Sequence, residues 1–527
     1  METEMLMGAE AIALGALHAG LSAAFAYPGT PSTEIMECLQ DIAAREGGFV
    51  AQWCSNEKTA FESSLGASYA GRRTMVSMKH VGLNVAADPF VNSALLKVNG
   101  GLVVVVADDP GMHSSQDEQD SRWYADFARV PCLEPSDSQE AYDMVREAFE
   151  LSERKACPVL LRIVTRLAHG RSSVAFSPRI AQKPVSKARD RWGWNLMPAV
   201  ARKLWSELLG KYEGIRSEIE AGSRIEAGSA ELGVITTGLA LQYYRENEAE
   251  LGQRPSHLHI ARYPIPHAAL RELASRVKRI LVLEEGYPFV ERHLRGVLDP
   301  ALPIAGKESG EVPLTGELSP DSIRPALGLP AREGQAGRGL VPPRRPPQLC
   351  AGCPHGDSFS FLTEALKGHQ VFTVNADIGC YTLGALPPYN AVETVVEMGA
   401  SFGMARGASE SGLRPAVGVI GDSTFYHSGI PNLVDAVSHG TNVKFMILDN
   451  ATTGMTGAQP TIMPSERLKA IALAVGVDPA HVHIVKAHRT EHAANVALLK
   501  RELEYEGVSV VIAFRECIEA LKKARKA

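Results

Sequence analysis

The stretch that decides the fold is Gly421-Asp-Ser-Thr-Phe425, which follows the apolar run Ala416–Ile420, together with Asp449-Asn450, which follows the run Val443–Leu448. Short β-branched runs that end in Gly, Asp or Asn are typical of parallel strands. A helix-like stretch separates the two runs, as the crossover between parallel strands requires. Both polar segments should therefore lie at the carboxyl ends of strands, where open α/β sheets bind ligands.

Asp422 and Asn450 have the side chains of a magnesium site. Mg²⁺ takes few protein ligands and completes an octahedral shell with phosphate oxygens and water. Asp422 would supply a carboxylate, Asn450 an amide oxygen and Thr452 a backbone carbonyl. Either segment alone is better explained as an ordinary turn, because Gly, Asp and Asn are the commonest turn residues. Together they resemble the Gly-Asp-Gly to Asn motif that holds Mg²⁺ and diphosphate in thiamine diphosphate (ThDP) enzymes, with Ser423 in place of the second Gly.

A second motif lies near the N-terminus. Asn56-Glu57-Lys58 followed by the Gly- and Ala-rich stretch 66–70 resembles the pyrimidine-binding signature of ThDP enzymes. In that family the glutamate faces the pyrimidine and promotes loss of the thiazolium C2 proton, which is proton-transfer chemistry suited to a carboxylate. Glu57 could alternatively be a first-turn residue that complements a helix dipole. The Gly421 to Asn450 motif on another domain favours the catalytic interpretation.

Longer stretches are similar to the large (α) subunit of indolepyruvate ferredoxin oxidoreductase. The similarity runs from about Met5 to Cys517. The stretches that carry it are Ala26–Ser32, Met78–Ala86, Val106–Ser115, Asp377–Leu383, Gly421–Phe425 and Ile447–Gly457. The resemblance implies that Thr30, His80 and Asn84 lie near the substrate and the thiazolium. It assigns cofactor binding to Gly379, Cys380, Gly421, Asp422, Ser423, Thr424, Asn450 and Thr452.

The pattern of runs predicts an α/β protein with three parallel-sheet domains. At about 150 residues per domain, 527 residues correspond to three or four. The resemblance makes these a pyrimidine-binding domain, a transketolase C-like middle domain and a diphosphate-binding domain. The expected ranges are 1–176 for the pyrimidine domain, 177–228 for a connector, 229–302 for the middle domain, 303–347 for a Pro-rich linker and 348–527 for the diphosphate domain.

Four of the eight cysteines could form one site. Cys350 and Cys353 open the third domain as Cys-x-x-Cys, and Cys380 and Cys517 each follow a strand. Four thiolates could bind either [4Fe–4S] or Zn²⁺, or they could be plain structural thiols. The resemblance implies an iron–sulfur cluster. Long members of the family also end in a ferredoxin-like module, and this chain stops shortly after Cys517 without one, so a separate iron–sulfur carrier is expected.

Composition excludes several classes of protein. Charged residues make up 22% and apolar residues 45% of the chain, as in ordinary globular proteins. Lys and Arg number 54 against 60 Asp and Glu, so there is no basic surplus for nucleic acid. No apolar run reaches the roughly 20 residues of a membrane span, Ala11–Tyr27 being a helix leading into a strand, and the protein is expected to be cytoplasmic.

The resulting functional hypothesis is oxidative decarboxylation of an aryl 2-oxo acid such as indolepyruvate, with transfer to coenzyme A and to ferredoxin. The expected partners are a small γ-type subunit and a second copy of the chain, because the two cofactor motifs lie on separate domains. A non-oxidative ThDP decarboxylase or carboligase is the alternative within enzymes. An inactive cofactor-binding scaffold subunit is the alternative outside them.

Overall fold

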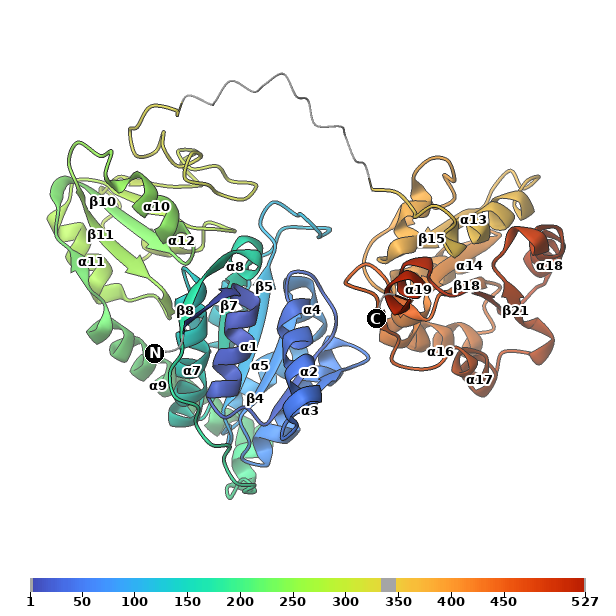
Figure 1. The fold of residues 1–527 in the computed structure, drawn as a ribbon, viewed down its shortest axis with the longest axis horizontal. Helices are drawn as coiled ribbons and strands as arrows, with labels where there is room; N and C mark the ends of the chain where they lie inside the picture. The colour runs from blue at the N-terminus through green and yellow to red at the C-terminus, as the bar shows by residue number, and fades with distance from the viewer. Residues whose placement is uncertain (1–2, 333–346, 526–527) are drawn as a thin grey trace. The chain divides into compact units, whose positions relative to one another are not determined.

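The computed structural model describes residues 3–332 and 347–525 and divides into two compact units, Met1–Gly337 and Arg338–Ala527 (Figure 1). Both units are α/β bodies built mainly on parallel strands, which confirms the predicted fold class. Among the described residues, no helix is long and apolar enough to cross a lipid bilayer.

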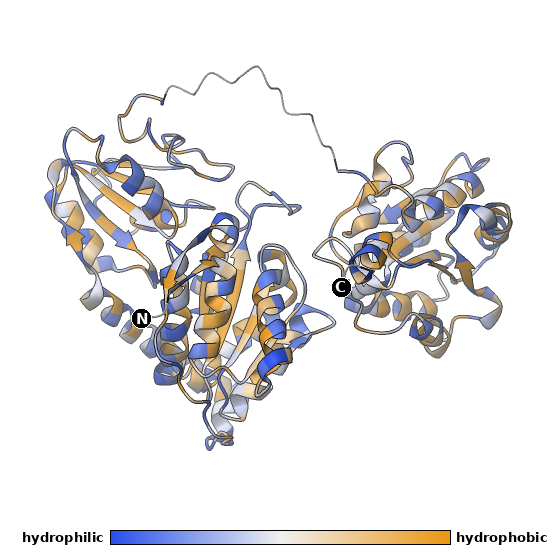
Figure 2. Ribbon diagram, viewed as in Figure 1, coloured by the Kyte–Doolittle hydropathy of each residue, from blue (hydrophilic) through white to orange (hydrophobic). Residues whose placement is uncertain are grey.

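Seven strands form the first sheet of unit 1. Across the sheet they run in the order β12 (Arg262–Tyr263), β6 (Cys132–Leu133), β7 (Val159–Val164), β5 (Leu102–Asp108), β4 (Thr74–Lys79), β2 (Ala23–Ala26) and β3 (Val50–Trp53). All neighbours are parallel except β12 with β6. Strands β4, β5 and β7 are buried along their whole length, and Figure 2 shows the centre of this sheet as mainly hydrophobic. Such strands need helices on both faces.

Helices cover both faces of this sheet. One face carries α1 (Gly8–His18), α2 (Thr33–Glu46) and α7 (Ser138–Lys155), and the other carries α3 (Glu57–Tyr69), α5 (Ala87–Leu95) and α6 (Arg122–Ala128). The short helices α4 (His80–Val85) and α8 (Thr165–His169) continue directly from β4 and β7. An antiparallel pair, β1 (Thr3–Met7) with β8 (Arg171–Ala175), borders α1. The carboxyl ends of β2, β4 and β5 therefore share one edge.

The second sheet of unit 1 has five strands. Their order is β14 (Ile304–Ala305), β13 (Ile280–Leu283), β10 (Ser229–Thr237), β11 (Pro255–Ile260) and β9 (Ile225–Glu226), with β9 antiparallel. The helices of this part are α9 (Pro198–Gly222), α10 (Ala240–Glu248), α11 (His267–Arg276) and α12 (Phe289–Leu294). The expected connector 177–228 thus contains a helix of 25 residues whose buried side chains include Leu208 and Ile215.

The segment 303–332 corrects one prediction. It was expected to be a linker that buries no core, yet Val312, Leu318 and Ile323 are each 0% exposed and pack with Tyr243 and Tyr244 of α10. Its isolated apolar residues, separated by Pro and Gly, have no helix or strand period, which is why the pattern read as a linker. The remainder of the expected linker, 333–346, lies outside the described residues.

Unit 2 has one sheet of six strands, all parallel. The order is β16 (Thr394–Val395), β15 (Thr373–Ala376), β17 (Ala416–Gly421), β18 (Lys444–Asp449), β22 (Ser509–Phe514) and β21 (Val482–Lys486). Its helices are α13 (Pro354–Ala365), α14 (Ala400–Glu410), α15 (Asp422–Thr424), α16 (Ile430–Ser438), α17 (Glu466–Val475), α18 (His492–Glu504) and α19 (Ile518–Ala524). A small hairpin, β19 (Thr452–Thr453) with β20 (Gln459–Pro460), follows β18. The two decisive strands of the sequence, β17 and β18, are neighbours.

A buried charge network joins the two sheets of unit 1. The Arg122 side chain is 0% exposed, forms an ion pair with Asp120, and lies 3.1 Å from Glu284 after β13. Arg162 of β7, also 0% exposed, contacts Asp108 at 2.6 Å and forms an ion pair with Glu134. Charges are retained in an interior only where partners satisfy them. The network therefore fixes the contact between the sheets.

Arg122→Met should destabilise unit 1 by about 3 to 5 kcal/mol, because it leaves Asp120 and Glu284 buried without their cation. Chemical denaturation of the whole chain, followed by far-UV circular dichroism, would measure the shift. Arg202→Met, at an exposed position of α9, is the control and should change little. A loss below about 1 kcal/mol in Arg122→Met would show that the network is not a determinant of stability.

Candidate active site

Two buried carboxylates meet at the carboxyl edge of the unit 2 sheet. The register pairs Gly421 with Leu448, so Asp422 and Asp449 follow at the ends of neighbouring strands. Their side-chain Oδ2 atoms are buried and have no hydrogen-bond partner among the described residues. Burial raises the pKa of both carboxyls, and the charge of Asp449 raises the pKa of Asp422 further. Two uncompensated acids in contact form a site that a divalent cation would stabilise.

The turn after β18 orients Asn450 toward the same edge. Asn450 Oδ1 accepts the backbone N–H of Thr452 at 3.1 Å, and Asn450 Nδ2 lies 3.2 Å from His355 Nε2. Burial lowers the pKa of His355 to about 4, so its ring is neutral at pH 7. Thr452 itself is buried at the start of the small hairpin. The structure thus brings together the three residues expected to hold Mg²⁺.

Two glycines give the edge its shape. A Cβ on Gly421 would lie 2.7 Å from Cε1 of the Tyr381 ring, and a Cβ on Gly379 would lie 2.4 Å from the same atom. The Tyr381 hydroxyl hydrogen-bonds to the buried carboxylate of Asp377. Ser423 Oγ lies 2.8 Å from Thr453 Oγ1 across the edge. Gly379 and Gly421 therefore both pack against the Tyr381 ring, and Ser423 lies beside Thr453 at the same edge.

The four cysteines of the sequence pattern are neighbours in unit 2. Cys353 and Cys517 precede the first turns of α13 and α19, and Cys380 begins a 3₁₀ turn. Burial raises the pKa of Cys380 to about 12, and the charges of the other three cysteines contribute to that rise. The Cys517 N–H donates to the Asn450 carbonyl oxygen at 3.1 Å. This bond connects the thiols to the carboxyl edge of the unit 2 sheet that carries Asp422, which we call the Asp422 edge.

The four thiols are neighbours but are not drawn together as closely as the ligands of a bound zinc ion. No three of their sulfur atoms lie within 4.8 Å of one another, whereas a tetrahedral zinc with Zn–S bonds of about 2.3 Å needs sulfurs about 3.8 Å apart. In the described residues, one group does meet that limit, formed by His481, His483 and Glu502. Its histidines already hydrogen-bond the Glu502 carboxylate at 2.7 and 2.9 Å, so it is satisfied as an ion-paired cluster.

Glu57 lies at the start of α3 in unit 1. The helix is capped by Asn56, whose Oδ1 accepts the Thr59 N–H at 2.9 Å. The Glu57 residue is only 6% exposed. A Cβ on Gly82 would lie 2.5 Å from Glu57 Oε1, so the carboxylate packs directly against the backbone of α4. Gly82 is therefore required for the position of Glu57.

His80 and Lys79 are buried at the end of β4. His80 is 1% exposed, and neither ring nitrogen has a hydrogen-bond partner among the described residues, Asp117 Oδ1 being 3.6 Å from Nε2. Burial lowers the pKa of Lys79, whose ammonium donates to the Ser114 carbonyl. Ser114 Oγ in turn donates to the Thr30 carbonyl at 3.3 Å. Thr30 and His80 thus lie at the edge formed by β2, β4 and β5.

Asn84 differs from the other expected residues of this edge. Its side chain is exposed on α4, and Oδ1 accepts the Tyr124 hydroxyl at 2.6 Å. It lies one helical turn after His80 on the same helix. The structure therefore places Thr30, Glu57 and His80 in buried or half-buried positions and Asn84 on the surface beside them.

Comparison with known proteins identifies the family. Residues 14–199 match the family model described as pyruvate flavodoxin/ferredoxin oxidoreductase, thiamine diphosphate-binding, and residues 377–526 match the thiamine pyrophosphate enzyme C-terminal domain. The chain is 38% identical to indolepyruvate oxidoreductase subunit IorA of Archaeoglobus fulgidus over 100% of this chain and 88% of that protein. The chain belongs to the IorA family of indolepyruvate oxidoreductase subunits.

Other matches agree with membership in the IorA family. IorA of Methanothermobacter thermautotrophicus is 39% identical over 97% of this chain and 86% of that protein. A solved 2-oxoglutarate:ferredoxin oxidoreductase from Magnetococcus marinus shares the fold at a TM-score of 0.52 and 18% identity, over 61% of this chain and 64% of that one. The family resemblance and the ThDP-superfamily α/β fold predicted from the sequence are confirmed, and the chain is a ThDP-binding 2-oxo acid oxidoreductase subunit.

Both matched family models fall on the two edges described above. The first covers Glu57 and His80, and the second covers Asp422 and Asn450. In this IorA-family chain the sequence alone indicated no individual role for three residues of these edges: Gly82, His355 and Asp449. Asp449 directly precedes Asn450, and Gly82 lies inside the stretch Met78–Ala86, so their positions in the motifs were the available signal. His355 follows Cys353-Pro354 but gives no signal in the sequence that it contacts Asn450.

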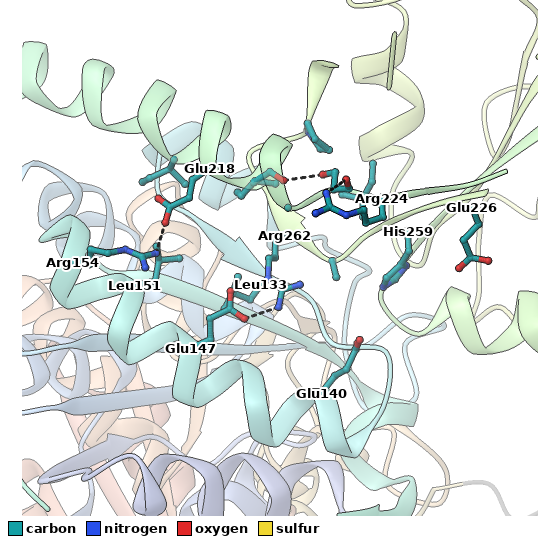
Figure 3. Close-up of a pocket in the computed structure, with 17 residues that line it drawn as sticks. Leu133, Glu140, Glu147, Leu151, Arg154, Glu218, Arg224, Glu226, His259 and Arg262 are labelled. Carbon is teal, nitrogen blue, oxygen red and sulfur yellow. Dashed lines mark hydrogen bonds and ion pairs between the residues drawn. The ribbon is translucent and has the colours of Figure 1, made fainter. Parts of the chain in front are cut away.

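The cavity drawn in Figure 3 is a separate feature of this IorA-family chain. It has a volume of about 570 Å³ and lies within unit 1 between α7, the end of α9 and strands β11 and β12. Two ion pairs lie in its lining, Glu147 with Arg262 at 2.6 Å and Arg154 with Glu218 at 2.7 Å. None of the predicted site residues lines it.

Proposed function

We propose that this chain is the ThDP-carrying subunit of an enzyme that oxidatively decarboxylates an aryl 2-oxo acid such as indolepyruvate. The acyl group passes to coenzyme A and the electrons pass to ferredoxin. The observation that carries the proposal is the pair of polar edges, one with a buried glutamate and one with an acidic metal-type cluster, on a chain similar to IorA over its full length. The aryl substrate follows the name of those relatives.

The Asp422 edge is the proposed seat of Mg²⁺ and the diphosphate. Asp422, the Asn450 side chain and the Thr452 carbonyl supply the oxygens that Mg²⁺ prefers, and Asp449 adds a second carboxylate beside them. Gly379, Cys380, Gly421, Ser423 and Thr424 line the diphosphate. The segment Asp422–Ser438 is one helical stretch, and its N-terminus at Asp422 favours an anion.

The proposed binding site of the pyrimidine and the substrate is the edge formed by the carboxyl ends of β2, β4 and β5, beside Glu57. Bound ThDP supplies a nucleophilic carbon and an electron sink for decarboxylation. The buried Glu57 carboxylate holds a proton at the pyrimidine ring, which is general acid–base work. The His80 ring, whose nitrogens have no hydrogen-bond partner among the described residues, and the Lys79 ammonium bind and orient the oxo acid, with Thr30 and Asn84 beside them. Burial of Glu57, Lys79 and His80 excludes water from the reacting centre.

The four thiols are the proposed ligands of one [4Fe–4S] cluster. Cys350, Cys353, Cys380 and Cys517 are neighbours, and cubane clusters take four Cys thiolates. Burial raises the pKa of Cys353, and the backbone N–H groups of His355 and Gly356 oppose that rise. Such a cluster would accept electrons one at a time.

Cys517→Ser should remove the cluster. Anaerobically purified wild-type protein should contain about four irons per chain, and the variant should lose most of that iron together with its visible absorbance. Cys38→Ser, a half-buried cysteine of α2 outside the group, is the matched control and should keep its iron. About one equivalent of zinc in the wild type, with no iron, would reject the cluster.

The proposal also assigns partners. Because the two edges lie in separate units, the assembled enzyme must bring them together within one chain or between two copies, and we propose a homodimer core. A small γ-type subunit and a ferredoxin or separate iron–sulfur carrier complete the electron path. Multi-angle light scattering of the purified chain should give the mass of a dimer, and a fully active monomer would contradict the homodimer.

A panel of oxo acids tests the reaction and the substrate. The complex would be assayed anaerobically with ThDP, Mg²⁺ and coenzyme A on indolepyruvate, phenylpyruvate, pyruvate and 2-oxoglutarate, with acyl-CoA and aldehyde quantified. We expect acyl-CoA and the highest kcat/KM for the two aryl acids. Free aldehyde as the main product would select the non-oxidative alternative, and preference for 2-oxoglutarate would reject the aryl assignment.

A further inference from the structure

We propose that His355 is a positioning residue that orients Asn450 toward the metal. The inference rests on the proposed function, because it requires Asn450 to be a ligand of Mg²⁺. His355 is the second residue of α13, directly after the Cys350–Cys353 loop, and is 3% exposed. Its side chain contacts Asn450 at the Asp422 edge, and its main chain lies two residues after Cys353.

The hydrogen bonds of Asn450 define which way its amide faces. The Thr452 N–H can only donate, so the atom that receives it at 3.1 Å must be Oδ1. Nδ2 therefore faces His355 Nε2 at 3.2 Å, and that ring nitrogen must be the acceptor. An amide that rotated by half a turn would present NH₂ to the cation in place of its oxygen. His355 opposes this rotation together with Thr452, because the rotated amide would set its NH₂ against the Thr452 N–H and its oxygen against the accepting Nε2.

The His355 ring is itself held in place. It packs edge-to-face on Tyr381, with centroids 6.2 Å apart and an interplanar angle of 86°. Its backbone N–H lies close enough to the Cys353 sulfur to oppose the rise in the pKa of that thiol caused by burial. Arg515 ties α13 to the end of β22 through Asp357 at 2.6 Å. Contacts of this kind are what allow a residue outside the ligand set to control metal affinity, typically by about 10- to 100-fold.

Asn450 is therefore fixed from two sides. Its side chain is oriented by His355, which follows Cys353, and its main-chain carbonyl accepts the N–H of Cys517 at 3.1 Å. Both segments belong to the cysteine group. Asn450 is therefore held by the same two segments that carry the cysteines. His355 is the side chain through which one of these segments orients the Asn450 amide.

The test measures Mg²⁺ affinity in the full chain, by titrating Mg²⁺ at fixed ThDP and following ThDP binding calorimetrically. His355→Phe keeps a planar ring against Tyr381 but lacks the acceptor, and should weaken Mg²⁺ binding about 10- to 100-fold. His355→Gln places an amide oxygen near the position of Nε2 and should stay within about threefold of wild type. His439→Leu, at an exposed residue after α16, should bind Mg²⁺ as wild type does.

An Asn450→Asp background separates orientation from general structure. A carboxylate has two equivalent oxygens and cannot be rotated wrongly, so His355→Phe should cost less than about threefold in this background. An equal loss in both backgrounds would overturn the inference, as would wild-type affinity in His355→Phe. If His355→Phe does not fold, a tenfold loss in folded His355→Gln overturns it instead. Absence of Mg²⁺-dependent ThDP binding in the wild type would refute the proposed function itself.

Discussion

Glu57→Gln should lower turnover by about 10²- to 10⁴-fold while the chain still binds ThDP and Mg²⁺. The amide preserves the shape of the side chain against Gly82 but cannot hold or release the proton at the pyrimidine. Binding depends on the Asp422 edge, which the substitution does not touch. Steady-state rates with indolepyruvate and calorimetric ThDP binding would give the two quantities.

Glu62→Gln is the matched control for this prediction. Glu62 lies one turn further along α3, is exposed, and pairs with Lys58 on the surface. Its substitution should leave turnover within about twofold, since exposed ion pairs contribute little. Near-normal turnover in Glu57→Gln would refute the assignment of the glutamate, and loss of ThDP binding would show that its role is structural.

Asp422→Asn should abolish Mg²⁺-dependent ThDP binding, with an affinity loss of about 100-fold or more, because the variant lacks the central carboxylate of the metal site. The metal-free variant should nevertheless unfold at a higher temperature than the wild type. Burial and Asp449 raise the pKa of Asp422, so its ionisation in the folded protein costs stability, and this cost appears as pH rises through the raised pKa. The neutral amide of Asp422→Asn does not ionise and therefore does not carry this cost in stability.

The same carboxylate predicts a pH dependence of metal binding. Mg²⁺ binds the ionised form, so affinity should rise with pH until Asp422 is deprotonated, and binding should release protons into the buffer. Asp435→Asn, at an exposed position of α16, is the control for both measurements. Unchanged Mg²⁺ affinity in Asp422→Asn, or a metal-free variant less stable than wild type, would contradict this account of the edge.

The sequence was sufficient for the parts of the fold that depend on continuous apolar runs. The run Val443–Leu448 corresponds to β18 at Lys444–Asp449, and the adjacency of Asp422 to the end of β18 follows from parallel pairing. Apolar runs of this kind mark buried strands without any knowledge of their partners.

Contacts between isolated residues could not be predicted. Leu318 and Ile323 belong to no periodic pattern, so the core they complete was mistaken for linker. The packing of Glu57 on Gly82 and the bond from Asn450 to His355 join residues that are distant in sequence, and only coordinates reveal them. The roles of all the predicted site residues, from Glu57 and Asp422 to the cysteines and Asn84, stay predictions.

The most direct test of the account is the electron balance of the reaction. Oxidation of a 2-oxo acid with coenzyme A gives acyl-CoA, CO₂, one proton and two electrons. The complex, supplied with indolepyruvate, coenzyme A and a one-electron viologen dye without oxygen, should therefore reduce two dye molecules for each CO₂ released. Release of CO₂ as aldehyde is formed, with no dye reduced, would contradict the account and identify a non-oxidative decarboxylase.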